Sequence, residues 1–256
     1  MSSSGAGGQA VVVGATGAVG GAVLRRLRKA GLAVVAVARD EGRLAGLAAD
    51  DPAVLPCPAD VGDDRCGALV AAACERVGEP VRMVVQAAGL PVSGPLSSVD
   101  PGLLGTLVGL KLGGLLRVVR ATEPLLGPGS RIVAVGGHFG SEPQPQACGA
   151  GVTNAALANL VRQLADHYGP RGVTAHLVAP GPLDTARLRG LAEAAAAHRG
   201  VTREEVLDEY REHSPMHRLT TVGEVAWAVA LLLDPEAVAL HGATLALDSG
   251  ARRGLF

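Results

Sequence analysis

The sequence predicts a three-layer, doubly wound α/β domain on a parallel sheet of seven strands. Short apolar, β-branched runs alternate with longer amphipathic segments, and a glycine-rich turn follows the first run. Strands without polar alternation are buried on both faces, which is typical of a parallel sheet covered by helices. Right-handed crossovers then give a doubly wound sheet with its ligand crevice at the carboxyl ends of the strands.

The strands and helices can be placed in order along the chain. Each expected strand is a continuous apolar run, and each expected helix has apolar residues at helical spacing. The expected strands are residues 10–13, 33–38, 53–56, 81–86, 131–135, 173–178 and 243–247. The expected helices are residues 17–30, 42–49, 63–77, 103–126, 149–168 and 222–233, with a helical excursion through Tyr210 after the sixth strand.

One domain accounts for most of the 256 residues. Residues 1–9 lack the charge and apolar core of a signal peptide, so we expect a disordered tail before a domain over 10–256. Residues 186–217, rich in Ala, Glu and Arg, have the composition of a helical lid. No linker or repeat indicates a second domain.

Composition argues against several classes of partner. A net charge of −1 and 2% aromatic residues give no basis for nucleic-acid binding. The most apolar stretch, 103–119, carries Lys111 and Arg117 and is too short to span a bilayer, so we expect no membrane association. The four cysteines lie at no metal-ligand spacing, so we expect no metal and a cytoplasmic protein with reduced thiols.

The turn after the first strand predicts a dinucleotide site. It reads Gly14-Ala-Thr16-Gly17-Ala-Val19-Gly20 and runs directly into the first helix. Glycines allow the tight turn, the close approach of pyrophosphate to the backbone and close packing of helix on strand. The helix N-terminus then offers free N–H groups and a partial positive charge to the phosphates.

The end of the second strand bears on which cofactor is bound. An acid there would bind the ribose diol of NAD, whereas an arginine accepts the extra phosphate of NADP. Arg39 comes first, after the neutral Ala38, which favours NADP(H) over NAD(H). Asp40, the next residue, would favour NAD(H) if its carboxylate faced the ribose.

Later segments extend this pattern to a family. Over residues 9–250 the chain resembles the single-domain branch of the short-chain dehydrogenase/reductase family, which has the Rossmann fold. Asp60-Val61 is similar to its adenine-contacting pair, Gln86-Ala-Ala-Gly89 to its Asn-Asn-Ala-Gly turn, Pro180-Gly-Pro-Leu-Asp-Thr185 to its Pro-Gly segment, and Leu247-Asp-Ser-Gly250 to its C-terminal segment. Val13 and Ala18 depart mildly from the glycine motif. The resemblance implies cofactor contacts from Gly14, Thr16, Gly17, Val19, Gly20, Arg39, Asp60, Val61, Ala87, Ala88, Gly89, Asn154, Pro180, Gly181 and Thr185.

The family's catalytic residues are not found at their expected positions. In the family a serine binds the substrate carbonyl, a tyrosine protonates it, a lysine lowers the pKa of the tyrosine, and an asparagine completes a proton relay. An ungapped register places Gly137 at the serine position, Ala150 at the tyrosine, Asn154 at the lysine and Lys111 at the asparagine. Glycine and alanine carry no proton, so the family's catalytic roles do not transfer.

Two other residues are candidates for the missing chemistry. The lysine and asparagine are exchanged between adjacent helices, so the ammonium of Lys111 could occupy the space of the family lysine and hold the ribose or act as an acid. Alternatively, Lys111 extends to the surface. His138 follows the vacant serine position and could supply an acid, or could be a loop histidine that faces elsewhere.

Several functions stay open at this stage. We expect an NADP-binding biosynthetic enzyme that acts on a small molecule, either by reducing an iminium or other preactivated substrate or by a non-redox cyclisation, elimination or isomerisation. One alternative is a non-catalytic subunit that pairs with an active paralogue, and another is an ordinary carbonyl reductase with substituted catalytic groups. The helices over 103–126 and 149–168 would form a homodimer or homotetramer, or a hetero-oligomer with that paralogue.

Overall fold

A seven-stranded parallel sheet forms the centre of the computed structural model, which describes residues 7–90 and 94–254. The strand order is β3-β2-β1-β4-β5-β6-β7, so the predicted fold class is confirmed. The strands are β1 (Gln9–Val13), β2 (Ala33–Ala38), β3 (Val54–Pro58), β4 (Val81–Gln86), β5 (Arg131–Val135), β6 (Thr174–Pro180) and β7 (Thr244–Leu247).

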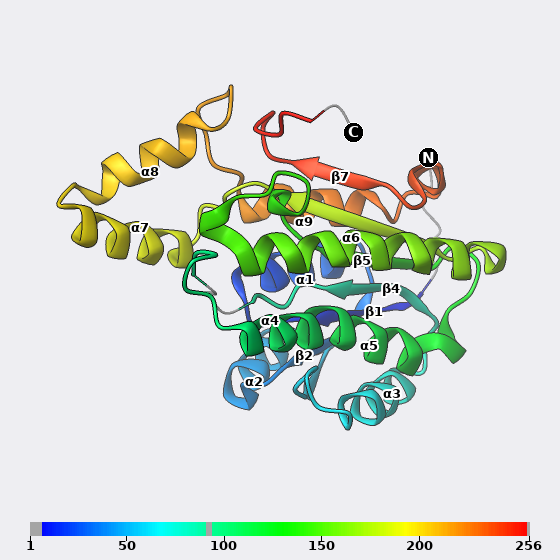
Figure 1. The fold of residues 1–256 in the computed structure, drawn as a ribbon. Coiled ribbons are helices and arrows are strands. Elements are labelled where there is room, and N and C mark those ends of the chain that lie inside the picture. Colours follow the sequence, from blue (N-terminus) through cyan, green and yellow to red (C-terminus); the bar gives the residue numbers. More distant parts are fainter. Residues whose placement is uncertain (1–6, 91–93, 255–256) are drawn as a thin grey trace.

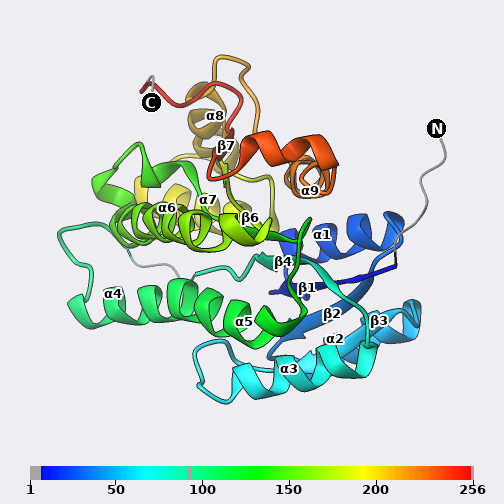
Figure 2. The same cartoon turned by 90° about the vertical axis from the view of Figure 1, so that its right-hand side faces the viewer.

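Helices cover both faces of the sheet and enclose two apolar cores (Figure 1). One face carries α1 (Ala18–Lys29), α2 (Glu41–Asp50) and α9 (Val222–Leu231), and α1 lies beside α9 (Figure 2). The other carries α3 (Cys66–Val77), α4 (Pro101–Val108), α5 (Gly114–Thr122) and α6 (Cys148–Tyr168). The β-branched side chains of the central strands point alternately into these two cores, which explains their continuous apolar sequence.

The helix predicted over residues 103–126 is interrupted by a π-helical turn. Residues Gly109–Gly113 form this turn between α4 and α5, and a 3-10 turn over Glu123–Leu125 ends the run. Leu107 and Leu115, on either side of the π-helical turn, are fully buried. Such turns are rare and are frequently found at functional sites, because the extra residue changes the direction of a side chain. Here the turn carries Lys111.

The expectation that this apolar stretch is too short to span a bilayer is wrong. The continuous helical run, Pro101–Leu125, has 25 residues and is long and apolar enough to cross a membrane; no second such helix occurs within the described residues. In this fold the run packs against α3 and α6 and buries Leu107, Leu115 and Val118. We therefore assign it to a helical layer of the domain, where the same apolar residues serve the core.

The segment predicted as a helical lid contains α7 (Ala186–Arg199) and α8 (Arg203–Glu212). Both project beyond the carboxyl ends of the strands (Figure 1). The two helices pack on each other through a small apolar cluster of their own that includes Leu188 and Leu207. Their separation from the two main cores supports the predicted role as a lid, which stays a prediction.

The domain begins one residue earlier than predicted. Gln9, which we placed in the tail, starts β1 and is fully buried. Its Nε2 donates hydrogen bonds to the carbonyl oxygens of Cys74 at 3.0 Å and Glu79 at 2.5 Å. These partners lie 65 and 70 residues further along the chain, so no local pattern indicates that the amide nitrogen is buried and hydrogen-bonded. Residues 1–6 of the predicted tail lie outside the described residues.

We expect Gly20→Ala to destabilise the protein, because a Cβ at this position would lie 2.1 Å from the carbonyl oxygen of Gly14. Moving the backbone of α1 away from the turn should lower the free energy of unfolding by about 1–3 kcal/mol. Urea denaturation measures this change. As a control, Gly46→Ala adds a Cβ with no neighbour within 4 Å on α2, and should raise stability by roughly 0.5–1 kcal/mol. Equal effects of the two substitutions would contradict the steric argument.

Candidate functional site

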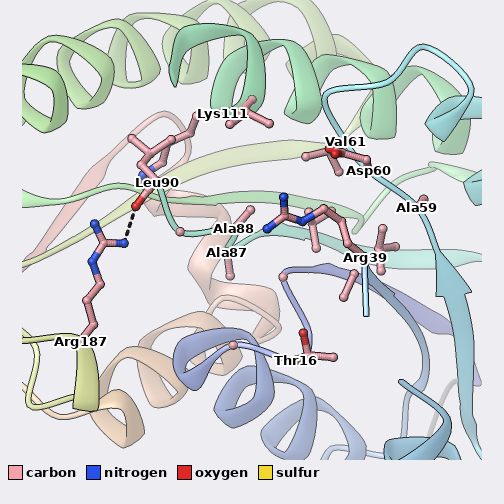
Figure 3. A pocket seen from close by; sticks show the side chains of 17 residues that line it. Thr16, Arg39, Ala59, Asp60, Val61, Ala87, Ala88, Leu90, Lys111 and Arg187 are labelled. Atoms are coloured by element: carbon pink, nitrogen blue, oxygen red, sulfur yellow. Dashed lines mark hydrogen bonds between the residues drawn. The ribbon is translucent and has the colours of Figure 1, made fainter. Parts of the chain in front are cut away.

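A cavity of about 500 Å³ opens at the carboxyl ends of the strands (Figure 3). Its walls come from the turn after β1, the ends of β2 and β3, the segment after β4, the π-helical turn and the start of α7. It is lined by Val13, Gly14, Thr16, Gly17, Val37, Ala38, Arg39, Ala59, Asp60, Val61, Ala87, Ala88, Gly89, Leu90, Leu110, Lys111 and Arg187.

The glycine turn has the geometry that a dinucleotide pyrophosphate needs. Gly14 has φ +77°, and a Cβ there would lie 2.9 Å from the carbonyl oxygen of Ala87 and the nitrogen of Ala88. Gly17 is the N-cap of α1 and carries no side chain that would block the first N–H groups of the helix. No acidic residue stands in the first turn of α1. The positive end of the helix therefore faces the cavity, and the residues present fit a dinucleotide.

At the ends of the neighbouring strands β2 and β3, Arg39 and Asp60 line the cavity (Figure 3). Asp60 accepts the N–H of Gly62 at 2.8 Å, which shapes the loop after β3. Asp40 is the N-cap of α2 and accepts the N–H of Arg43 at 3.0 Å. The carboxylate that could have favoured NAD(H) therefore has a local structural partner, and it is the guanidinium of Arg39 that borders the cavity.

Nine of the predicted cofactor residues line the cavity: Gly14, Thr16, Gly17, Arg39, Asp60, Val61, Ala87, Ala88 and Gly89. The other six do not border it within the described chain: Val19, Gly20, Asn154, Pro180, Gly181 and Thr185. Val19 packs against the core, and Gly20 lies under the turn. Thr185 is the N-cap of α7 and accepts the N–H of Leu188 at 3.3 Å.

Sequence reasoning missed Arg187, which enters the cavity from α7. Its guanidinium donates to the carbonyl oxygen of Leu90, so it bridges the lid and the segment after β4 (Figure 3). Its position two residues after Thr185, an expected cofactor contact, was the available signal. The composition of the predicted helical lid gave no other indication.

Lys111 is the buried cation of the site, with 6% of its surface exposed. Its Nζ donates a hydrogen bond to Oδ1 of Asn154 at 3.1 Å. Burial and, to a smaller extent, the nearby charge of Arg187 lower the pKa of Lys111 to about 8. The buried Gln86 donates from Nε2 to the carbonyl oxygen of Lys111 at 3.3 Å, which ties the π-helical turn to β4. Lys111 and Asn154, the lysine and asparagine that we predicted to be exchanged relative to the family, are thus in direct contact.

Gly137 and Ala150, which we predicted to stand at the serine and tyrosine positions, have no ionisable side chain. Gly137 follows β5, and Ala150 lies half-buried near the start of α6. Tyr168 is at the far end of α6, where its ring lies 5.5 Å from the guanidinium carbon of Arg171. Tyr210 is on α8 and packs against the lid cluster. Among the described residues that border the cavity there is no tyrosine.

His138 lies apart from this cavity. It is 8% exposed, and its ring packs 4.4 Å from the ring of Phe139. Both ring nitrogens are enclosed and have no hydrogen-bond partner in the described part of the chain. Burial lowers the pKa of His138, and the carboxylates of Asp248 and Glu142 oppose that shift. The structure therefore brings Lys111, but not His138, to the cavity wall.

The fold and the glycine turn define a doubly wound protein of the nucleotide-binding class. The chain belongs to the short-chain dehydrogenase/reductase family: the family model described as Enoyl-(Acyl carrier protein) reductase matches residues 14–252. It is similar to the short-chain reductase protein NovJ of Streptomyces niveus, with 30% identity over 94% of this chain and 92% of that protein.

Two solved structures show the same architecture. One is an NADPH-bound short chain oxidoreductase from Pseudomonas aeruginosa PAO1 containing an atypical catalytic center, with TM-score 0.85, 26% identity and coverage of 96% of this chain and 97% of that one. The other is a variant of the actinorhodin polyketide ketoreductase with NADPH, with TM-score 0.87, 28% identity and coverage of 98% and 99%. These relatives are oxidoreductases, so the class of this chain is an oxidoreductase of that family.

We expect Lys111→Met to be more stable than the wild type at pH 7. Because the pKa of Lys111 is lower in the folded than in the unfolded state, protonation favours unfolding, and stability rises as pH increases from about 8 towards 10.5. Removing the ammonium should therefore raise the free energy of unfolding at pH 7 by about 2–3 kcal/mol, less the lost hydrogen bond.

Urea denaturation of both proteins at pH 7 and pH 10 measures this difference, which should narrow at the higher pH. Lys29, the other lysine of the chain, is exposed on α1, so Lys29→Met is a control expected to show no such pH-dependent gap. If the free energies of unfolding of Lys111→Met and the wild type differed by the same amount at both pH values, the ammonium would not be buried in solution.

Proposed function

We propose that this protein is an NADPH-dependent reductase of a small-molecule carbonyl compound and that Lys111 supplies the proton. One observation carries the proposal: a buried lysine whose pKa is lowered to about 8 borders the cavity that fits a dinucleotide. A general acid works best when its pKa lies near the working pH, and Lys111 is much closer to neutrality than an ordinary lysine. Gly137 and Ala150 could supply no proton, so the chain would work without the family's serine and tyrosine.

The residues of this chain would complete a simple reduction. Bound NADPH supplies a hydride to the carbonyl carbon. As the C=O π pair moves onto the oxygen, that oxygen takes a proton from Nζ of Lys111, and the neutral amine is then reprotonated from solvent. Burial limits competition from water at the ammonium, and Oδ1 of Asn154 holds it in place through the 3.1 Å hydrogen bond.

The charges at this end of the cavity favour a carbonyl over an iminium substrate. Lys111 and Arg187 both border the cavity, and Arg187 contributes to the lowered pKa of Lys111, which places the two cations within electrostatic reach of each other. A cationic iminium would be repelled by both. A neutral ketone, or one that carries an anionic group, meets no such repulsion. The similarity to a polyketide ketoreductase supports the same substrate class.

We also propose that NADPH is preferred over NADH. The guanidinium of Arg39 borders the cavity, whereas the carboxylate of Asp40 caps α2. An arginine is suited to the extra phosphate of NADP because its planar fork of donors matches phosphate geometry. Two solved relatives with at least 26% identity were obtained with NADPH.

Arg39→Ala should weaken NADPH binding by about ten- to a hundredfold, the value of one or two charge-assisted hydrogen bonds, and should leave NADH binding nearly unchanged. Fluorescence titration with each cofactor gives both dissociation constants. Arg26→Ala, on the exposed side of α1, is the matched control and should affect neither. Equal weakening of NADPH and NADH binding by Arg39→Ala would contradict a specific phosphate contact.

With ethyl acetoacetate as a probe ketone, we expect the wild type to consume NADPH, followed as a loss of absorbance. Lys111→Met should lower kcat by at least about a hundredfold, as removal of a general acid does. Because the acid must be protonated, the wild-type rate should fall as pH rises through about 8. Lys29→Met should retain full activity. Undiminished activity of Lys111→Met would refute the assigned role, and no NADPH consumption by the wild type would refute the reductase function.

A further inference from the structure

The space beside Gly137 is filled by a side chain from another element. Gly137 has φ 179° and ψ 155°, an extended conformation that any residue can adopt. A Cβ at Gly137 would nevertheless lie 2.9 Å from Nδ2 of Asn154, whereas the next neighbour, the carbonyl oxygen of Pro180, would be 3.8 Å away. The backbone therefore permits a side chain at position 137, and the amide of Asn154 is what excludes it.

The orientation of this amide follows from its contact with Lys111. An ammonium group only donates hydrogen bonds, so the atom of Asn154 that lies 3.1 Å from Nζ must be the oxygen. The amide nitrogen consequently points to the space beside Gly137. Asn154 is 5% exposed, and Nδ2 makes no hydrogen bond within the described chain. Unlike the ring nitrogens of His138, it is not sealed from solvent.

Because Nδ2 can be reached from solvent and has no partner within the described chain, it is available to an acceptor from outside the chain. Polar groups in such places are almost always hydrogen-bonded, so water or a ligand oxygen would accept from it. The donor stands beside the end of β5, and the proton source Lys111 is bonded to the oxygen of the same amide. In a carbonyl reduction, negative charge develops on the substrate oxygen and is stabilised by hydrogen-bond donors that are already in place.

We propose that Nδ2 of Asn154, the group that lies beside Gly137, donates a hydrogen bond to the carbonyl oxygen of the substrate. The inference rests on the proposed reductase function. Asn154 then has two tasks, since its oxygen orients Lys111 and its nitrogen binds the reacting oxygen. Gly137 is required because any Cβ would displace the amide.

The mutual exclusion of the two side chains gives a direct test in a double-mutant cycle. Gly137→Ser alone should lower kcat for ethyl acetoacetate at least tenfold, because the serine displaces the amide. Asn154→Ala alone should lower kcat at least tenfold, because the donor is lost. The double variant Gly137→Ser/Asn154→Ala should have a kcat at least fivefold higher than that of Asn154→Ala. In the double variant the serine hydroxyl has room and can donate a hydrogen bond to the substrate oxygen.

The matched control combines Gly137→Ser with Asn159→Ala, since Asn159 is exposed on the same helix and its Oδ1 accepts from Gln163. In this control the effects of the two substitutions on kcat should multiply, and Asn159→Ala should restore none of the activity that Gly137→Ser removes. All variants should bind NADPH within threefold of the wild type, which also establishes that they fold. A double variant no more active than Asn154→Ala would overturn the proposed role of Asn154.

A spectroscopic measurement separates donation to the substrate from positioning of Lys111. In the wild-type complex with NADP⁺ and ¹³C-labelled ethyl acetoacetate, the ketone stretching frequency should lie below its value in an aprotic solvent. Asn154→Ala should remove most of this shift, whereas Lys111→Met should retain most of it. An unchanged shift in Asn154→Ala would overturn the inference and leave the reductase function standing. Absence of NADPH consumption by the wild type would refute both.

Discussion

The hydrogen bond between Lys111 and Asn154 is the contact on which the chemistry that we propose depends. An ammonium that is 6% exposed is tolerated only with an acceptor close by, and Oδ1 of Asn154 at 3.1 Å supplies it. The π-helical turn, held to β4 by Gln86, directs Lys111 inward. Burial then lowers the pKa of the ammonium to about 8, which is the property that our proposal uses for proton donation.

The two halves of the site follow different physical rules. The cofactor end depends on backbone geometry, because Gly14, Gly17 and Gly20 allow the close approach of turn, helix and ligand. The substrate end that we propose combines Lys111 from the π-helical turn and Arg187 from α7, which border the cavity, with Asn154 from α6, which contacts Lys111. The amide of Asn154 lies beside Gly137, so contacts between side chains of distant segments shape this end.

Membership of a family of oxidoreductases sets the class of this protein, and the arrangement of its own residues refines the chemistry we propose. Two cations at one end of the cavity disfavour a cationic substrate, so the structure shifts our expectation from an iminium to a carbonyl. His138, a candidate from its place after Gly137, is enclosed against Phe139 and does not border the cavity.

The amino-acid sequence by itself determined the seven strands, the helical layers and nine of the residues that line the cavity, because apolar periodicity and glycine turns are local properties. It also led to the hypothesis that a lysine and an asparagine are exchanged, which stays a prediction. Tertiary structure decided that Lys111 and Asn154, 43 residues apart, meet in a buried hydrogen bond, and that Asp40 caps a helix while Arg39 borders the cavity. It also decided that Gln9 belongs to the sheet and that Arg187 enters the site. Such contacts depend on how distant helices pack, and no local pattern encodes that packing.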